Sequence, residues 1–440
     1  MNMDALVVAR TAILVLLSVA AASHGFTQSG SLDPAFTRVP FDQWLHNGDH
    51  AQIRWTTHVL HPQLSTHQRL LARVEVQMDG AELAKRRGKG QLVIFVQLKD
   101  GEDRLYQDHG TIELEKLEEG IRNQNVTYVE SAFVLPGDYR IAVAIFDTAT
   151  GEHSAKQEKL HVSALRSDPL PDAWRDLPPV ELIPHGEPPD SWYLPTVAGR
   201  LHLRAETRRP LQIAVIVNLS PSERLSRAQQ VPERNLGALL PALKILSQIA
   251  VREGSLSVTL VDLARRRVTF HQEDMHNLDW PALKDSLTQA DAGTIDVKSL
   301  EDRHHKAEFF VAEVSRRIGA APKEKLSGAP VPARVLIVLS NPVEFESGED
   351  LQPIRPAPEQ DCQAFYIRYH PPIVSPVVPA PPTVRGRRPH PGYSSRSLRE
   401  AQIDQLEPTL KPLGPQLFDV ETPEQFRKAL ATMLSAISSL

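Results

Sequence analysis

Two stretches decide the predicted fold: IAVIVNLSPS at residues 213–222 and RVLIVLSNP at residues 334–342. Each is an apolar, β-branched run that ends abruptly in small polar residues. Such runs are typical of buried parallel strands that deliver a loop to the carboxyl edge of a sheet. Ligands of open α/β sheets bind at that edge. The polar residues at these two strand ends are therefore the first candidates for a functional site.

Strands and helices are expected to alternate around these two stretches, from residue 201 to residue 440. Such alternation predicts an α/β fold with a doubly wound, mostly parallel sheet. We expect a proline-rich loop at 371–391 within this domain. The expected strands are 211–217, 256–261, 267–270, 334–339, 364–369 and 416–420; the expected helices are 235–252, 296–318, one that opens at Asp279-Trp280-Pro281 and one that follows Thr422.

Residues 33–165 predict a separate all-β domain. Strands are expected at 92–98, 126–134, 135–147 and 154–162, with turn residues between them, which favours a β-sandwich. The phrase LPGDYRIAVAIFD at 135–147 resembles the closing hairpin of bacterial immunoglobulin-like modules, with Tyr139 packed at the corner where the strand begins. The proline-rich range 166–200 is expected to be an extended linker between the two domains.

The N-terminus predicts export. An apolar run follows Arg10 and ends in Ala20-Ala21-Ala22, small residues of the kind that signal peptidases prefer, so residues 1–24 are expected to be a signal peptide. The alternative is an uncleaved anchor, although the run is short for a bilayer span. The expected location is secreted or periplasmic, with no stable membrane span after cleavage.

Composition argues against a nucleic-acid partner and rules out an intrachain disulfide. The formal net charge is -5 and the pI is about 6.4, so no global basic field indicates a nucleic-acid partner. The chain has one cysteine, Cys362, which makes an intrachain disulfide impossible.

The second half of the chain resembles a von Willebrand factor type A domain. That family carries Asp-x-Ser-x-Ser after its first strand, and Asn218, Ser220 and Ser222 stand at the matching positions here. Its loop threonine matches Thr294, and its later aspartate matches Asn341. The resemblance implies a metal-ion-dependent adhesion site, where Mg²⁺ or a related ion bridges to an acidic group of a partner protein.

The sequence departs from the family at both carboxylates. Hard cations such as Mg²⁺ and Ca²⁺ bind oxygen ligands, and carboxylates supply much of the attraction. Asparagine keeps the size of aspartate and removes its charge. We therefore expect no bound metal or cofactor, with at most weak Mg²⁺ or Ca²⁺ binding. An open alternative is that Ser220 and Ser222 cap the next turn while Asn218 and Asn341 satisfy backbone groups.

These observations favour a non-enzymatic protein that binds an unknown protein partner through Asn218, Ser220, Ser222, Thr294 and Asn341, in adhesion or assembly. No catalytic set stands out. One alternative is a hydrolase whose residues converge only in space; His58, His61 and His67, in a stretch that we expect to be irregular, are weak candidates. Another is a purely structural envelope component whose sandwich mediates assembly.

Overall fold

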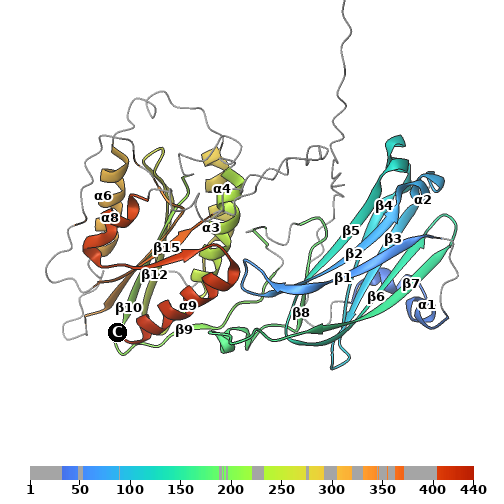
Figure 1. Ribbon diagram of the computed structural model, residues 1–440, viewed down its shortest axis with the longest axis horizontal. Coiled ribbons are helices and arrows are strands. Elements are labelled where there is room, and N and C mark those ends of the chain that lie inside the picture. The colour runs from blue at the N-terminus through green and yellow to red at the C-terminus, as the bar shows by residue number, and fades with distance from the viewer. Residues whose placement is uncertain are drawn as a thin grey trace, which may run out of the picture.

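The computed structural model describes residues 32–47, 53–88, 90–187, 191, 193–194, 197–220, 232–273, 277–291, 305–319, 331–343, 345, 354, 362–370 and 404–440. It is a mixed α/β structure in two lobes, one built from strands and one from a sheet with helices (Figure 1). The predicted signal peptide at 1–24 and the predicted loop at 371–391 lie outside the described residues. None of the helices in the described ranges has the length and apolar character that a bilayer span requires.

The N-terminal lobe consists of two four-stranded antiparallel sheets, ordered β1-β2-β5-β8 and β4-β3-β6-β7. Inward side chains of the two sheets form one core, to which β2 contributes Val76 and β3 contributes Ile94. The strands are β1 (Trp55–Leu64), β2 (Leu70–Asp79), β3 (Gln91–Lys99), β4 (Leu105–Glu113), β5 (Asn125–Val134), β6 (Gly137–Asp147), β7 (His153–Val162) and β8 (Val180–Ile183).

Four details of this lobe bear on the sequence predictions. The strands expected at 92–98, 126–134 and 154–162 are confirmed as β3, β5 and β7, and the strand expected at 135–147 begins later, as β6 at Gly137. The domain is not purely β, because α1 (Phe41–Asn47) and α2 (Gly80–Lys85) are helices. The stretch that holds His58 and His61 is not irregular: it is β1, an edge strand, where Pro62 is tolerated at a register shift.

The range 166–200, predicted as an extended linker, contains regular secondary structure. It contains a 3-10 turn, Pro171–Trp174, and the edge strand β8, which pairs with β5. Prolines flank β8 and leave its four residues free to pair. The packed polypeptide between the lobes is therefore partly a strand of the sandwich.

The C-terminal lobe contains a six-stranded sheet ordered β13-β12-β10-β14-β15-β16. Five of its strands run parallel, and β13 is an antiparallel edge. The strands are β10 (Leu211–Asn218), β12 (Gly254–Asp262), β13 (Arg267–Gln272), β14 (Ala333–Ser340), β15 (Cys362–Tyr369) and β16 (Gln416–Val420); a two-stranded sheet joins β9 (Leu203–Ala205) to β11 (Ile249–Val251).

Helices cover both faces of the six-stranded sheet, as Figure 1 also shows. One face packs against α3 (Pro232–Leu246), α4 (Trp280–Asp291) and α9 (Pro423–Ser438), and the other against α6 (Lys306–Gly319) and α8 (Leu406–Leu410). The predicted doubly wound, mostly parallel sheet is confirmed at this level. The helix expected over 235–252 was wrong at its end, because Ile249–Val251 leaves the helix to pair with β9 as β11.

The turn between β1 and β2 and the segment from Asp168 to Trp174 connect the two lobes. Arg427 of α9 is 2% exposed and donates to both carboxylate oxygens of Asp168, at 2.6 and 2.8 Å. Its guanidinium also lies 4.6 Å from the ring centre of Trp174. The indole N–H of Trp174 donates to the carbonyl of Gln68, whose side chain donates in turn to the carbonyl of Pro423. These contacts hold the lobes in one orientation.

Candidate functional site

The candidate site lies where the strand order reverses, at the carboxyl ends of β10 and β14. β10 is the first long strand of this sheet along the chain, and it pairs with β12 on one side and with the much later β14 on the other. Connections therefore leave the two strands in opposite directions and open a crevice between them, the place where such sheets bind ligands. Asn218 ends β10, Ser340 ends β14, and Asn341 follows β14 directly.

Asn218 and Ser220 are held by internal hydrogen bonds. The Asn218 amide N–H donates to Ser340 Oγ at 2.9 Å, and Asn218 Oδ1 accepts from the backbone N–H of Ser220 at 3.0 Å. Ser220 Oγ donates to Asp262 Oδ1 at 3.1 Å and accepts from the N–H of Ala264 at 2.9 Å. The Asn218 side chain thus connects the end of β10 to β14, and the Ser220 side chain connects it to β12.

Asn341 behaves differently. Asn341 is 1% exposed, and neither its side-chain nitrogen nor its side-chain oxygen has a hydrogen-bond partner among the residues that the structure describes. Ser340 Oγ donates to the Asn341 backbone carbonyl at 2.6 Å, which fixes the main chain but leaves the side chain unpaired. Leaving a buried polar group unpaired costs about 1–3 kcal/mol. An amide that offers both a donor and an acceptor is therefore kept unsatisfied at the reversal of the strand order.

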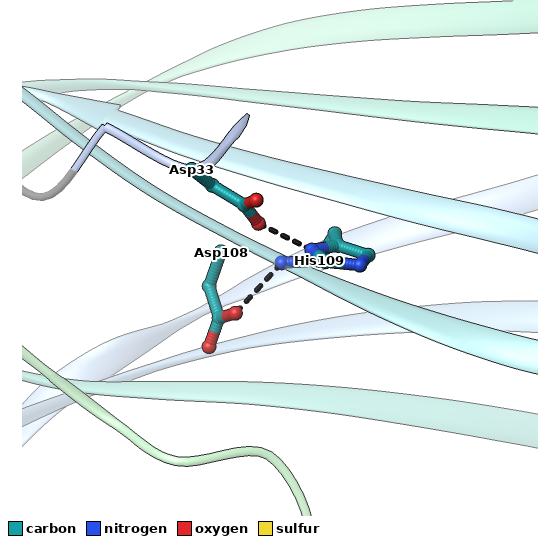
Figure 2. Close-up of side chains that lie close together, drawn as sticks. All are labelled: Asp33, Asp108 and His109. Atoms are coloured by element: carbon teal, nitrogen blue, oxygen red, sulfur yellow. Dashed lines mark hydrogen bonds and ion pairs between the residues drawn. The ribbon is translucent and has the colours of Figure 1, made fainter. Parts of the chain in front are cut away.

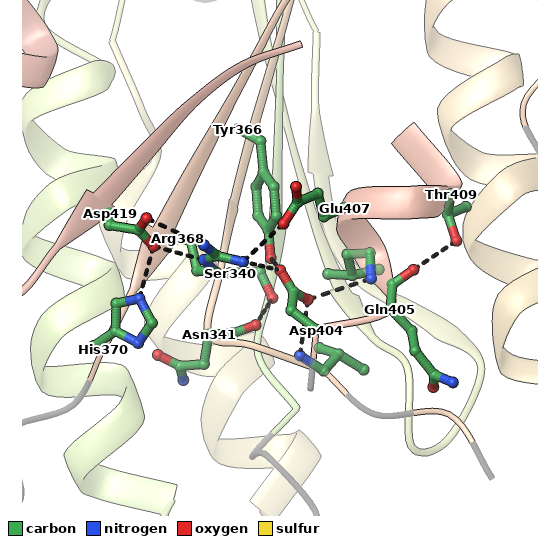
Figure 3. A network of polar contacts seen from close by, with 12 residues as sticks. Ser340, Asn341, Tyr366, Arg368, His370, Asp404, Gln405, Glu407, Thr409 and Asp419 are labelled. Atoms are coloured by element: carbon green, nitrogen blue, oxygen red, sulfur yellow. Dashed lines mark hydrogen bonds and ion pairs between the residues drawn. The ribbon is translucent and has the colours of Figure 1, made fainter. Parts of the chain in front are cut away.

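The carboxylates that the structure describes near this edge are paired with arginine. Asp262, 9% exposed, lies 3.3 Å from Arg265 Nη1 and 3.6 Å from Arg267 Nε. On the other side of the site, Arg368 bonds to Asp404, Asp419 and Glu407 (Figure 3). Each of these carboxylates is held in an ion pair within the protein, and Arg368 shares its single positive charge among three of them.

The Arg368 network has a clear electrostatic order. Burial raises the pKa of Asp404, although Arg368 and the Tyr366 hydroxyl oppose the shift. Burial alone would raise the pKa of Asp419 too, but hydrogen bonds from Arg368 and His370 lower it overall. His370 Nε2 donates to Asp419 at 2.8 Å, while His370 Nδ1 is buried without a partner (Figure 3).

Three of the five predicted site residues, Asn218, Ser220 and Asn341, gather at this edge, while Ser222 and Thr294 lie outside the described residues. Sequence reasoning missed Asp262, Arg368 and Asp404. Strand register was the available signal for Arg368, which stands opposite Ser340 and Asp419. Asp404 had no such signal, because it belongs to a turn before α8 that reaches the site only in the folded chain.

A second cluster of titratable groups lies in the sandwich, at Asp33, Asp108 and His109 (Figure 2). Their ligand atoms all lie within 4.8 Å of one another, so the group could hold a metal ion. Each residue also has a structural bond. Asp33 caps a 3-10 turn and bonds to His109 Nδ1, and Asp108 Oδ1 accepts from the N–H of His109 at 2.8 Å.

Burial in this second cluster disfavours the charged form of Asp108. Burial raises the pKa of Asp108 to about 6, with a further contribution from the charge of Asp33. Hydrogen bonding to Asp33 raises the pKa of His109, which favours the charged imidazolium beside the Asp33 carboxylate. The cluster fastens the N-terminal segment to the edge strand β4.

Comparisons with known proteins give no family. No protein-family model matches the chain, and no curated protein matches it. One solved structure that it resembles, assigned as ApaA from Bordetella pertussis, has 12% identity and a TM-score of 0.17, over 27% of this chain and 98% of that one. Another, a β-glucosidase from Listeria innocua in complex with isofagomine, has 13% identity and a TM-score of 0.16, over 26% of this chain and 16% of that one. Similarities this weak carry no functional argument.

Proposed function

We propose that the chain is an exported, non-enzymatic protein that binds a protein partner through the carboxyl edge of a von Willebrand A-like sheet. The strand order and the antiparallel edge strand support this proposal, as do the positions of Asn218, Ser220 and Asn341 at the crevice. Binding of this partner serves adhesion or assembly outside the cytoplasm, either in the periplasm or after secretion.

The observation that carries the proposal is the unpaired amide of Asn341. A buried donor and acceptor without partners gain free energy when another molecule supplies an acceptor and a donor. Of the two sequence-based interpretations of this residue, satisfaction of a nearby backbone group would need hydrogen bonds that the Asn341 side chain does not make to any described residue. Partner contact accounts for the same geometry without leaving its amide unpaired.

Metal binding is weakened or lost in this proposal. The Asn218 nitrogen is a donor and cannot ligate a cation, and the Asn218 oxygen already accepts from Ser220. The described carboxylates near the crevice are already engaged in ion pairs with Arg265, Arg267 and Arg368. Contact with the partner is therefore made by neutral polar groups and needs no bridging ion.

The N-terminal lobe acts as an immunoglobulin-like scaffold in this proposal. The Tyr139 hydroxyl donates to the carbonyl of Leu135 at 2.8 Å, at the turn into β6. A tyrosine at this position that bonds a few residues upstream is a hallmark of immunoglobulin-like sandwiches. The lobe and its contacts with Arg427 of α9 would hold the binding edge at a fixed distance and orientation from the N-terminal end.

The test compares partner capture by three forms of the mature protein. A variant with Ser220→Ala, Thr294→Ala and Asn341→Ala should recover much less partner from an envelope extract of the source organism than the unmodified protein. A control with Thr432→Ala and Ser286→Ala, which removes hydroxyls on α9 and α4, should recover as much as the unmodified protein. Circular dichroism establishes that all three forms are folded. Equal recovery by the triple variant would refute the proposed binding edge.

A further inference from the structure

A cavity lies at the opposite edge of the C-terminal sheet from Asn341. Its volume is about 350 Å³, and it lies between residues 193–194 and 197–200, the end of α3 and the start of α4. Because α3 follows β10 and runs back along the sheet, the end of α3 reaches the amino edge. The volume falls within the range of small-molecule sites.

The cavity combines apolar walls with positive charge. Tyr193, Leu278 and Trp280 contribute apolar and aromatic surface, and Lys244 and Arg200 contribute cations. Among the described residues that line it, there is no aspartate or glutamate. Lys284 Nζ lies 4.5 Å from the ring centre of Tyr193 and adds a third positive charge to that wall. The surroundings thus favour a negatively charged ligand with an apolar body.

Lys244 is the group best placed to bind such a ligand. Its ammonium makes no hydrogen bond or ion pair to any residue in the described part of the chain. Burial lowers the pKa of Lys244 to about 8, which is the response expected of an ammonium with too few counter-charges. The nearest influential carboxylate, Glu181, is already bonded to Arg69 and to the backbone N–H groups of Ala198 and Gly199.

We propose that this cavity binds a small monocarboxylate with an aromatic or apolar body, and that Lys244 donates to its carboxylate. Arg200 bonds to the neutral side-chain oxygen of Asn277, so its guanidinium keeps its charge and adds attraction at the cavity. The positive end of the α4 helix lies beside the cavity and acts in the same sense, although Asp279 caps that helix at Ala282. The apolar walls beside Lys244 suit a monoanion with an apolar body better than the strongly hydrated phosphate ion. This site is independent of the proposed binding edge.

The test is calorimetric titration of the whole protein with benzoate, with the neutral isostere benzamide and with inorganic phosphate. Benzoate should bind, and benzamide and phosphate should bind at least tenfold more weakly. Lys244→Met should weaken benzoate binding about ten- to one-hundred-fold, the value of a charge-assisted hydrogen bond. Lys244→Arg should retain much of the binding, and Lys428→Met, at an exposed position of α9, should retain all of it.

The pH dependence supplies a readout that does not rely on a variant. Benzoate affinity should fall as the pH rises from 7 through about 8, because Lys244 loses its proton there. His67, which also interacts with Lys244, has its pKa lowered to about 3 by burial and stays neutral over this range, while Arg69 and Glu181 remain bonded to each other. No heat with benzoate at its highest soluble concentration would overturn the proposal. Equal affinity for benzamide or phosphate, or unchanged binding by a folded Lys244→Met variant, would overturn it as well.

Discussion

Replacing Asp108 with asparagine should stabilise the protein at neutral pH. Asp108 faces Asp33 and His109 on one side and interacts with Glu130, a buried carboxyl whose pKa is raised well above its ordinary value by burial. Asparagine keeps the oxygen that accepts the N–H of His109 and removes the charge that burial penalises. The change thus isolates the cost of ionising this carboxyl inside the sandwich.

The magnitude follows from proton linkage. The pKa of Asp108 rises from 3.8 to about 6 in the folded protein, a difference of about 2.2 units. Each unit is worth about 1.36 kcal/mol, so ionisation costs the folded state up to about 3 kcal/mol. Because the folded pKa of Asp108 lies above the unfolded one, the protonated carboxyl favours the folded state. This stabilisation is fully present below about pH 4 and is lost as the pH rises through about 6.

Urea unfolding at pH 4, 6 and 8 measures the effect. Asp108→Asn should be more stable than the unmodified protein by as much as about 3 kcal/mol at pH 8 and should match it near pH 4. Asp138→Asn is the control, because Asp138 is 84% exposed in the same lobe and pairs only with exposed His161. A gain at pH 4 equal to that at pH 8, or no gain at all, would refute the argument from burial.

Two further substitutions test the contact of Arg427 between the lobes and the hydrogen bond of Tyr139 at the start of β6. Arg427→Met should destabilise the protein by about 3–5 kcal/mol, because it leaves Asp168 partly buried without its arginine. Thermal unfolding of this variant beside Lys428→Met measures that loss, and equal melting temperatures would contradict the role given to Arg427. Tyr139→Phe should cost about 1 kcal/mol through the hydrogen bond to Leu135. A more stable Tyr139→Phe variant in urea unfolding would mean that this hydrogen bond does not support the corner.

The sheet of the C-terminal lobe could be predicted because its strands carry their own signal. Residues 211–217 and 334–339 are mostly apolar and rich in β-branched side chains, as expected of strands covered on both faces. The polar residues that follow were expected at one edge, and Asn218 and Ser340 do bond to each other there. Parallel strands end at the same edge, so strand prediction alone brought these residues together.

The parts that sequence reasoning missed depend on contacts between distant segments. β1 was hidden by Pro62 and by exposed polar residues, which an edge strand tolerates. The short strand β11 follows α3 directly, and only its pairing with β9 distinguishes it from another helical turn. The arginine that pairs with Asp404 is Arg368, which comes from the earlier strand β15. No spacing in the sequence indicates which carboxylate an arginine will meet.

The central claim is that the binding edge keeps the shape of a metal-dependent adhesion site without its negative charge. Calorimetric titration with Mg²⁺, Mn²⁺ and Ca²⁺ tests it on the unmodified protein and on a variant with Asn218→Asp and Asn341→Asp. We predict little or no heat for the unmodified protein and measurable binding by the variant, because two carboxylates would then face the crevice. Tight binding by the unmodified protein, or no binding by a folded variant, would contradict the claim.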